Sequence, residues 1–429
     1  MTSPDIKEGI LFPLTGPIDR DMVSSGEQKI QWAYQYMPVL QAIRKRFEEE
    51  KPLAGQKIGM ALHVEAKTAC LVRTLAAGGA EVYITGCNPL STQDDVAEAL
   101  REGGIECYAK RGCNTEEYYE AIDKVLDAKP TLTIDDGMDL INRVHIDRRD
   151  CLPQIIGACE ETTTGIHRLK AMHADGKLEF PVIAVNDTPM KHYFDNVHGT
   201  GESALSSIML TTNCLVAGKH VVVAGYGYCG RGVATKARAL GARVIVTEVD
   251  PRRALQAHFD GFDVLKMTEA AKLGDLFITT TGNCSIITGE HFPLLKDGAL
   301  LANAGHFNNE ITIPWLEEHA SEIDHRDGID TYVVDGKKIH LLAEGRLVNL
   351  ATPKGMGHPI EVMDLSFAVQ ALSVEYMAKH GKELEPGVHD VPTEIDEYIA
   401  RLKLESVGAS LDELTPEQIE YMGSWNHGT

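Results

Sequence analysis

The sequence predicts an α/β protein with two doubly wound domains, each built on a mostly parallel sheet. Three observations support this fold class. The chain has 429 residues, more than one hydrophobic core usually accommodates. Short apolar stretches alternate with amphipathic ones, as expected of strands followed by crossover helices. The alternation starts afresh near Lys219, where a second series of strands and helices begins.

In the first half of the chain, strands and helices alternate at short intervals. The expected strands are Lys57–His63, Glu81–Thr85, Ile105–Ala109, Thr131–Ile134 and Val182–Val185, and the expected helices are Ala66–Ala77, Gln93–Glu102 and Glu116–Ala128. In such folds, ligands bind beyond the carboxyl ends of the strands. His63 and the pair Asp135 and Asp136 lie at two of these ends, which makes them site candidates.

The second series begins with the strand His220–Ala224. The helix Arg231–Leu240 follows, and the further expected strands are Arg243–Thr247, Leu276–Thr280 and Ala299–Ala302. A helical region is expected over Pro359–His380, and an acidic, partly helical tail over Thr393–Trp425.

The composition is that of an ordinary globular chain without affinity for polyanions. Apolar residues make up 43% and charged residues 24% of the sequence. The net charge of −22 excludes a broad electrostatic attraction to nucleic acid or to an anionic membrane surface. No stretch is long enough to span a bilayer, and Met1–Asp21 lacks the apolar segment of a signal peptide. We therefore expect a cytoplasmic protein that binds neither nucleic acid nor membranes.

The cysteines argue against disulfides and against a structural metal. There are nine of them, scattered along the chain, with no CxxC pair. This pattern matches neither a secreted disulfide framework nor a zinc site, so no metal is expected.

A glycine-rich turn gives the strongest binding signal. The strand His220–Ala224 runs directly into Gly225-Tyr226-Gly227-Tyr228-Cys229-Gly230, and a helix follows. In this setting the first glycine permits a tight turn, the second lets the backbone approach a pyrophosphate, and the third lets helix and strand pack closely. The helix N-terminus offers N–H groups to the phosphates. Taken alone, the glycines are also compatible with a mere tight turn.

Glu248 closes the second strand of this unit and indicates which dinucleotide binds. Its carboxylate can accept hydrogen bonds from the adenosine ribose hydroxyls, and it would repel the 2′-phosphate of NADP. NAD is therefore the expected cofactor. Arg252 and Arg253 lie nearby and leave room for NADP.

Two polar stretches in the first half are further candidates. Glu160-Glu161-Thr162-Thr163-Thr164-Gly165 is either a capped helix start or a polar loop that holds a cofactor and a substrate. In the second stretch, Asn186–Asn196, Lys191 and Asp195 are four residues apart. Such a pair can be an exposed helical ion pair, but its place after a strand and ahead of the dinucleotide unit favours a catalytic pair.

Two histidines complete the candidates. Gly305-His306-Phe307 follows a strand and could bring an imidazole to the nicotinamide end of the cofactor, and Met356-Gly357-His358-Pro359 is the second candidate. A single histidine is more often structural, so both interpretations stay open.

In this order, these segments resemble the adenosylhomocysteinase (S-adenosylhomocysteine hydrolase) family. The resemblance runs from about Gln28 to Trp425, and EETTTG (160–165) and LAEGRLVNL (342–350) are far more specific than a glycine motif. The other matching stretches are Leu62-His63 with Lys67-Thr68-Ala69, Ser91–Asp94, Asp135-Asp136-Gly137, Val185–Asp187 with Lys191 and Phe194–Asn196, Val223–Gly227, Glu248 with Asp250-Pro251, Gly305–Phe307 and Gly357–Pro359.

The resemblance implies reversible hydrolysis of S-adenosyl-L-homocysteine to adenosine and L-homocysteine with tightly bound NAD. In the family, NAD⁺ oxidises the nucleoside 3′-hydroxyl to a ketone, which acidifies the C4′ hydrogen. A base then removes that proton, homocysteine leaves C5′, water adds, and the hydride is returned. The small-molecule partner is thus a nucleoside thioether.

Residue roles are implied at the matching positions. Lys191, at a lowered pKa, would handle the 3′-hydroxyl proton with Glu161. His63 with Asp136 would serve C4′ and the leaving group. Asp195 would hold the ribose and polarise Lys191, and His306 would lie beside the oxidised carbon. The implied NAD-binding residues are Thr162, Thr163, Thr164, Asn196, Gly225, Tyr226, Gly227, Tyr228, Cys229, Gly230, Glu248, Arg253, Asn283, Ala304, Gly305, His306 and Asn349. The implied substrate-binding residues are His63, Glu65, Lys67, Asp136, Glu161, Lys191, Asp195 and His358, the last lying over the base and closing the cleft.

The resemblance also implies an architecture. An NAD-binding Rossmann domain, residues 196–356, would be inserted in a split substrate-binding domain of residues 1–195 and 357–390, followed by a C-terminal helical tail over 391–429. A homotetramer is the expected assembly. Many members end in an extension with a Lys and a Tyr that reaches a neighbouring subunit's NAD site. This chain stops without it, so a short-tailed member is expected.

A further departure from the family concerns the base pocket. Many members carry Thr and Glu where this chain has Glu65 and Lys67, and there they hold the adenine edge. Glu65 and Lys67 could grip hypoxanthine, serve adenine, or only pair with each other. Adenine is the expected base, and S-inosyl-L-homocysteine, which gives inosine and homocysteine, is the alternative substrate.

Two other classes of protein fit a dinucleotide-binding chain. One is a catalytically silent NAD-binding regulator, against which the presence of all the matching catalytic residues argues. The other is a simple NAD-dependent alcohol dehydrogenase, which would release NADH during turnover.

Overall fold

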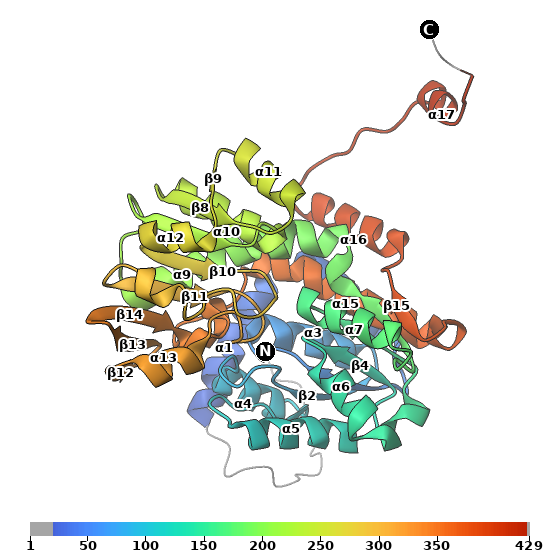
Figure 1. Cartoon of the computed structure of the whole chain (residues 1–429). Helices are drawn as coiled ribbons and strands as arrows, with labels where there is room; N and C mark the ends of the chain where they lie inside the picture. Colours follow the sequence, from blue (N-terminus) through green and yellow to red (C-terminus); the bar gives the residue numbers. More distant parts are fainter. Residues whose placement is uncertain (1–19, 427–429) are drawn as a thin grey trace.

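The structure is a computed structural model, which describes residues 20–426 of the chain. It contains two sheets, and the α/β class predicted from the sequence is confirmed. Figure 1 shows most of the first sheet and its helices in blue and green, the returning α15 and β15 in orange-red, and the second sheet in yellow-green to orange. Nearly all of the segment Met1–Asp21, expected to lack a signal peptide, lies outside the described residues.

The first sheet has seven strands in the order β15-β6-β5-β4-β1-β2-β3, and every neighbouring pair is parallel. The strands are β1 Lys57–Ala61, β2 Glu81–Thr85, β3 Glu106–Cys107, β4 Leu132–Asp135, β5 Gly157–Glu160, β6 Pro181–Ala184 and β15 Gly387–His389. The strand order reverses between β1 and β4, and at such a switch point the loops diverge to leave a crevice for a ligand.

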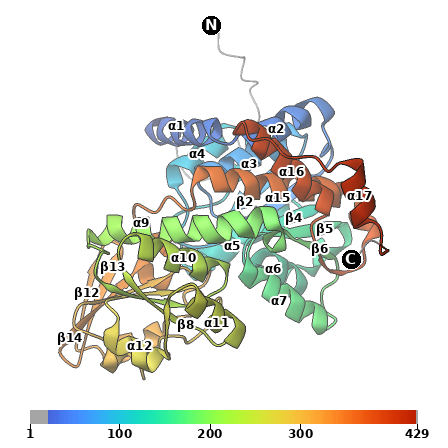
Figure 2. The same cartoon turned by 90° about the horizontal axis from the view of Figure 1, so that it is seen from above.

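Helices cover both faces of the first sheet, as Figure 2 shows from above. One apolar core lies under helices α1 Arg20–Gln35, α2 Pro38–Glu50, α3 Ala66–Ala77, α4 Asp94–Glu102 and α15 Ile360–His380. A second core lies on the opposite face, under α5 Thr115–Asp127, α6 Asp139–Ile146 and α7 Thr163–Ala174. Because α15 and β15 follow the second sheet in the chain, the chain returns to the first sheet after building the second.

The second sheet has eight strands in the order β12-β13-β14-β11-β10-β7-β8-β9. They are β7 His220–Ala224, β8 Arg243–Thr247, β9 Asp263–Val264, β10 Leu276–Thr279, β11 Ala299–Asn303, β12 Glu322–Arg326, β13 Ile329–Val334 and β14 Lys337–Leu342. From β9 to β14 all neighbours are parallel, in the order of a dinucleotide-binding Rossmann sheet, with its switch point between β7 and β10. The packed helices are α9 Thr200–Thr212, α10 Tyr228–Ala239, α11 Pro251–Phe259, α12 Met267–Leu273 and α13 Ile313–His319.

The two sheets are joined at two places. A short helix, α8 Pro189–Lys191, runs into a π-helical segment, His192–Gly199, and then into α9. The return passes through α14 Val348–Ala351 to α15. Both connections border the cavity described below.

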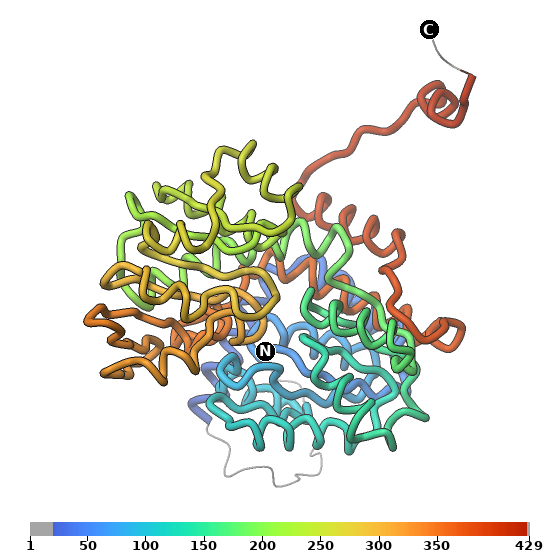
Figure 3. The backbone as a smooth tube through the Cα atoms, viewed as in Figure 1, coloured from blue at the N-terminus to red at the C-terminus, as the bar shows by residue number. Residues whose placement is uncertain are grey.

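The C-terminal region divides into two parts. Helix α16 Thr393–Ser406 packs on α15 and α2, and its Ile399 is fully buried. The next helix, α17 Pro416–Met422, has no buried residue. In Figure 3 the chain beyond α16 runs out from the body towards α17. The first half of the predicted tail therefore belongs to the packed body.

Most predicted elements coincide with observed ones, and α3, β2, β7 and β8 have the predicted bounds. Strands β12, β13 and β14 were not predicted, and β13 pairs antiparallel with both of the others. All residues of β12 are exposed, so the strand has no apolar pattern to reveal it. All nine cysteines are free. Among the described residues, no helix combines the length and apolarity that crossing a membrane would require.

Candidate active site

A single cavity of about 900 Å³ extends along the carboxyl ends of both sheets. Its lining joins residues that follow β1, β4 and β5 of the first sheet to residues that follow β7, β8, β10 and β11 of the second. The site residues predicted from the sequence line it except Tyr226, Gly230 and Asp135. Asp135 is fully buried, and its carboxylate accepts hydrogen bonds from the backbone N–H groups of Asp136 and Ile141, so its candidacy as a site residue is wrong. The cavity therefore joins the two switch points in one space.

The glycine turn has the shape that a dinucleotide requires. Gly225 has a φ of +95°, and a Cβ on Gly230 would lie 2.0 Å from the Gly225 carbonyl oxygen, so these two positions serve the turn and the packing of α10. A Cβ on Gly227 would meet only Arg253, at 3.7 Å, and would otherwise point into open space. Helix α10 starts at Tyr228 without a side-chain cap, which leaves its first N–H groups for a phosphate. These features fit NAD.

Glu248 is fixed at the end of β8. Its carboxylate accepts hydrogen bonds from the backbone N–H groups of Tyr226 (2.7 Å), Val249 (2.7 Å) and Asp250 (3.0 Å). Tyr226 itself is buried, and its hydroxyl donates to Asp260 at 2.7 Å, so only its backbone belongs to the site. Arg252 pairs with Asp250 at 2.7 Å, outside the cavity lining, whereas Arg253 lines the cavity. The Glu248 carboxylate would repel a 2′-phosphate, and Arg252 does not line the cavity, so the site favours NAD over NADP.

The EETTTG stretch forms both a helix start and a cavity wall. Thr162 occupies the N-cap position of α7, but its side chain makes no capping hydrogen bond. The three threonines line the cavity, and Asn186 donates to the Thr163 hydroxyl at 2.9 Å. The hydroxyls are thus not used up by capping the helix, which supports the interpretation as a polar binding loop.

Lys191 lies at the centre of a buried polar cluster. Its ammonium donates hydrogen bonds to Asn186 Oδ1 and Asn196 Oδ1, both at 2.9 Å, and lies 3.8 Å from Asp195 and 4.0 Å from Glu161. Both members of the Lys191–Asp195 pair are buried, so the alternative of an exposed helical ion pair is wrong.

The expectation that Lys191 has a lowered pKa is also wrong. Burial alone would lower the pKa of Lys191, but the carboxylates of Asp195 and Glu161 outweigh it and hold that pKa above its ordinary value. Burial would likewise raise the pKa of Asp195, yet the charges of Lys191 and His358 hold it well below its usual range. The lysine is therefore a charged donor and Asp195 an anion.

Glu161 also belongs to this cluster, and the pKa of its carboxyl group is raised. Burial raises the pKa of Glu161 to about 8, and Lys191 opposes this rise. Gln370, on α15, donates to Glu161 Oε2 at 2.5 Å, while Glu161 Oε1 is buried without a hydrogen-bond partner among the described residues. Asp195 is held by two neighbours. The Ser366 hydroxyl donates to Asp195 Oδ2 at 2.6 Å, and His358 Nδ1 lies 2.6 Å from Asp195 Oδ1. Neither Gln370 nor Ser366 was predicted, because both lie in an apolar helix with no motif.

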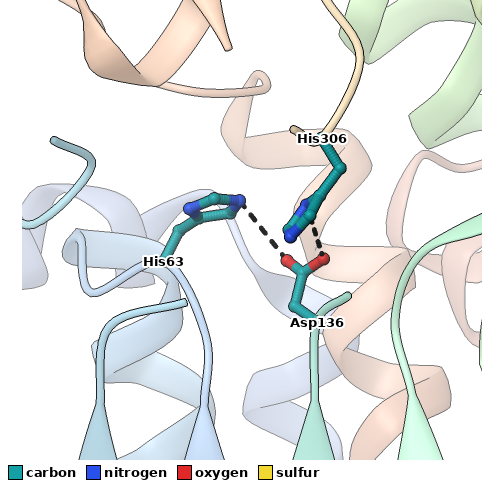
Figure 4. Close-up of side chains that lie close together, drawn as sticks. All are labelled: His63, Asp136 and His306. Carbon is teal, nitrogen blue, oxygen red and sulfur yellow. Dashed lines mark ion pairs between the residues drawn. The ribbon is translucent and has the colours of Figure 1, made fainter. Parts of the chain in front are cut away.

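A second cluster lies where β1, β4 and β11 end. His63 Nε2 is 3.5 Å from one oxygen of Asp136, and His306 Nδ1 is 3.4 Å from the other (Figure 4). Burial lowers the pKa of His63 to about 4 and the pKa of His306 to about 4, and burial raises the pKa of Asp136. Both imidazoles are therefore neutral at pH 7, in the form of a proton acceptor.

Glu65 and Lys67 are paired with each other. Lys67 Nζ lies 2.7 Å from Glu65 and donates to the Met356 carbonyl at 2.7 Å. Glu65 also caps α3, since it accepts from the backbone N–H groups of Lys67 (3.1 Å) and Thr68 (3.2 Å). The two side chains thus pair with each other and also line the cavity with Gly357 and His358, so binding of either base and pairing alone all stay predictions.

Comparisons with known proteins agree with this geometry. The family model "S-adenosyl-L-homocysteine hydrolase" matches residues 18–151, and the model of that family's NAD-binding domain matches residues 196–355. The chain is 60% identical to S-inosyl-L-homocysteine hydrolase of Methanopyrus kandleri, over 99% of both chains. It is 60% identical to the Methanosarcina mazei protein of the same name, over 96% of this chain and 100% of the other. It is 57% identical to adenosylhomocysteinase of Archaeoglobus fulgidus, over 94% of this chain and 100% of the other. The chain belongs to the S-adenosyl-L-homocysteine hydrolase family, and its cofactor is NAD.

Proposed function

We propose that the protein catalyses reversible hydrolysis of S-adenosyl-L-homocysteine to adenosine and L-homocysteine with NAD that stays bound. One observation carries the proposal: a single cavity joins the dinucleotide turn to two buried acid–base clusters. When bound, NAD⁺ supplies a reversible oxidation of the nucleoside 3′ carbon. The two clusters supply the proton transfers that accompany this oxidation, at the 3′-hydroxyl, at C4′ and at the leaving sulfur.

The cluster around Lys191 suits the 3′-hydroxyl group. Because Lys191 is held charged, it can donate a hydrogen bond to the 3′ oxygen and stabilise negative charge there. Glu161, with a pKa of about 8 and a free buried oxygen, is the proton acceptor. Asp195 positions Lys191 and can bind the ribose.

The cluster around Asp136 suits the neighbouring carbons. A neutral His63 can accept the C4′ proton, and Asp136 stabilises the imidazolium that forms. The same proton can then protonate the homocysteine sulfur as it leaves C5′. His306 faces the other oxygen of Asp136 and would lie beside the oxidised carbon.

The direct test mixes NAD-loaded protein with S-adenosyl-L-homocysteine and follows free thiol and bound cofactor together. We expect many equivalents of homocysteine per chain, with the amount of bound NAD unchanged and no free NADH. Release of NADH in proportion to turnover would identify an alcohol dehydrogenase. Binding of NAD without thiol release from either S-adenosyl- or S-inosyl-L-homocysteine would identify a silent regulator.

S-Inosyl-L-homocysteine is the second candidate substrate, and Glu65 and Lys67 are the reason. Adenine offers an amino donor at C6 and an acceptor at N1, whereas hypoxanthine offers an acceptor at O6 and a donor at N1. The buried Lys67 ammonium could donate to O6, and Glu65 could accept from N1–H. With adenine, Glu65 could accept from the amino group while Lys67 keeps its bond to Met356.

A comparison of kcat/KM for the two nucleosides decides between them. A pocket built for one base edge can reject the other by 10⁴ or more, because its buried polar groups go unpaired. A preference for inosine above about tenfold would overturn adenosine as the substrate and leave the mechanism unchanged.

We also propose the division into domains predicted from the sequence, with residues 196–356 inserted between 1–195 and 357–390, and with 391–429 as the tail. The pairing of β15 with β6 supports this division, since the pairing returns the chain to the first sheet.

We further propose a cytoplasmic homotetramer. Exposed apolar side chains along the C-terminal arm, Leu411, Leu414, Ile419, Met422 and Trp425, support a subunit contact. Light scattering on the purified chain tests the assembly.

A further inference from the structure

Two fully buried carboxyl groups adjoin the two acid–base clusters. Asp135 ends β4 and Glu160 ends β5, and the two residues are partners in the parallel register of these strands. Both side chains are fully buried, and neither lines the cavity. Each directly precedes a carboxylate of the proposed mechanism, since Asp136 follows Asp135 and Glu161 follows Glu160. No step of that mechanism uses either buried group.

One oxygen of Glu160 holds the backbone behind both of those carboxylates. Glu160 Oε1 accepts hydrogen bonds from the N–H groups of Gly137, at 2.8 Å, and of Thr162, at 3.1 Å. Gly137 follows Asp136 in the chain, and Thr162 follows Glu161. The direction of a side chain depends on the position of its backbone, so this single oxygen helps to aim both carboxylates.

Two glycines leave the room that this arrangement needs. A Cβ on Gly165, in the first turn of α7, would lie 2.2 Å from the carboxyl carbon of Glu160. Gly137 has a φ of +102°, and a Cβ there would lie 2.3 Å from His306 Nε2. Because the Gly137 backbone is packed against this imidazole, a displacement of Glu160 would move Asp136 relative to its histidine.

The hydrogen bonds of the pair indicate which member carries a proton. Both oxygens of Asp135 accept from backbone N–H groups, Oδ1 from Asp136 at 3.0 Å and Oδ2 from Ile141 at 2.8 Å. Glu160 Oε1 accepts from two N–H groups, whereas Glu160 Oε2 is buried and has no hydrogen-bond partner among the described residues. An ionised carboxylate needs donors at both oxygens, which Asp135 has and Glu160 lacks. A proton on Glu160 Oε2 turns the unpartnered acceptor into a donor.

The electrostatic surroundings of the pair agree with this assignment. Burial raises the pKa of Glu160 well above its ordinary value, and the charge of Asp135 raises it further. Burial also raises the pKa of Asp135, but the backbone N–H of Ile141 opposes that rise. Within residues 20–426, no cation forms an ion pair with either group, and Arg168, whose charge acts on Asp135, pairs with Asp139 at 2.7 Å. Two adjacent buried negative charges without a paired cation are costly, so the pair holds a proton.

We propose that Glu160, protonated at Oε2, and the ionised Asp135 form a positioning pair. The pair aims the carboxylates of Asp136 and Glu161, and so links the groups for the 3′-hydroxyl to the groups for C4′ and the leaving sulfur. Its proton stays in place during turnover and is donated from Glu160 to Asp135, the neighbour in register. The positioning role rests on the proposed function, whereas the place of the proton does not.

Two isosteric variants of the NAD-loaded protein test where the proton lies. Glu160→Gln keeps an acceptor oxygen and puts an amide N–H donor where the proton lies, so kcat and Tm should stay nearly unchanged. Asp135→Asn is the matched variant. It puts an amide nitrogen opposite the backbone N–H of Asp136 or Ile141, so it should lower both quantities. Equal effects of the two variants, or the reverse order, would overturn the assignment.

Infrared difference spectra between the unchanged protein and Glu160→Gln provide a direct readout. The substitution should remove the C=O band of a protonated carboxyl group, which shifts in D₂O. A role in packing alone would not predict which band is lost. Loss of a carboxylate band instead would show that Glu160 is ionised and would overturn the assignment.

Gly165→Ala tests the positioning role and alters neither carboxyl group. Alanine favours a helix more than glycine does, but the added Cβ must displace the Glu160 carboxyl. We expect the variant to retain NAD and to bind adenosine with a near-normal Kd, while kcat falls by about 10²-fold, as a misplacement of about 1 Å can cause. Lys170→Ala, a change at an exposed position of the same helix, is the control and should keep the normal kcat.

Both chemical steps should be slower in Gly165→Ala. Stopped-flow absorbance on addition of adenosine measures the reduction of bound NAD⁺, and deuterium uptake at C4′ in D₂O, per NADH formed, measures the next step. A normal kcat, or a loss confined to one of the two steps, would overturn the positioning role. If the unchanged protein fails to reduce its NAD⁺ with either adenosine or inosine, the proposed function fails and the positioning role with it, whereas the infrared result still decides the place of the proton.

Discussion

The ammonium of Lys191 lies 3.8 Å from the carboxylate of Asp195, one helical turn further along the chain, and both side chains are buried. Two asparagine oxygens hold the same ammonium at 2.9 Å. Four acceptors or anions around one buried lysine favour its charged form. Lys191 is thus arranged to donate a hydrogen bond, and in the proposed mechanism it stabilises a developing alkoxide while Glu161 accepts the proton.

Replacing Lys191 should stop 3′-oxidation without removing the cofactor. We expect Lys191→Ala to retain NAD and to reduce bound NAD⁺ about 10²–10⁴-fold more slowly when adenosine is added. Stopped-flow absorbance of NADH measures this rate. Lys170→Ala is the matched control, since Lys170 forms an exposed pair with Asp187 at 3.1 Å and should keep the normal rate. A near-normal rate of NAD⁺ reduction in Lys191→Ala would contradict the proposed role of Lys191 in 3′-oxidation.

Two glycine variants test the dinucleotide turn. A Cβ on Gly227 meets no protein atom closer than 3.7 Å, so Gly227→Ala should fold normally but occupy the space that the pyrophosphate needs. In Gly230→Ala the Cβ would collide with the Gly225 carbonyl at 2.0 Å, so this variant should also lose thermal stability. Calorimetry with and without NAD measures both effects. Normal NAD binding by Gly227→Ala would place the phosphates elsewhere.

Glu248 should decide between NAD and NADP. Hydrogen bonds to a charged group contribute about 1.5–3 kcal/mol, so Glu248→Ala should weaken NAD binding by about 10–100-fold. The same change removes the repulsion of a 2′-phosphate, so the ratio of the affinities for NAD and NADP should fall. Arg252→Ala, whose arginine lies outside the cavity lining, should change neither affinity. An unchanged preference in Glu248→Ala would show that the ribose is held by other groups.

The pH dependence of the first step should follow Glu161. A proton acceptor must be ionised, so the rate of NAD⁺ reduction should rise with pH through about 8, the pKa to which burial raises Glu161. Gln370 donates to Glu161 and thereby stabilises the ionised form. Removing this donor in Gln370→Met should raise the pKa of Glu161 further and shift the rise of the NAD⁺-reduction rate to higher pH. If the rate of this variant rises at the same pH as in the unchanged protein, Glu161 is excluded as the titrating group.

The sequence predicted the sheet class and about half of the cavity lining, the half that local patterns and the family resemblance indicate. Gly225 and Gly227 follow a strand, and His63 follows another, so their positions at the sheet edge could be inferred. The pKa direction of Lys191 could not, since it depends on how many anions the fold gathers around one buried ammonium. The same holds for Gln370 and Ser366. They reach the site from the largely buried helix α15, which packs on the first sheet after the chain has built the second one.

The proposed function predicts a specific isotope pattern. Hydrolysis of S-adenosyl-L-homocysteine by the NAD-loaded protein in D₂O should give adenosine with deuterium at C4′, because the removed proton leaves with the homocysteine sulfur and the hydrogen returned to C4′ comes from the added water. The hydrogen at C3′ should remain protium, because the hydride is returned from the bound cofactor. Nuclear magnetic resonance of the product measures both positions. Adenosine that carries protium at C4′ would show direct displacement at C5′ and would contradict the account.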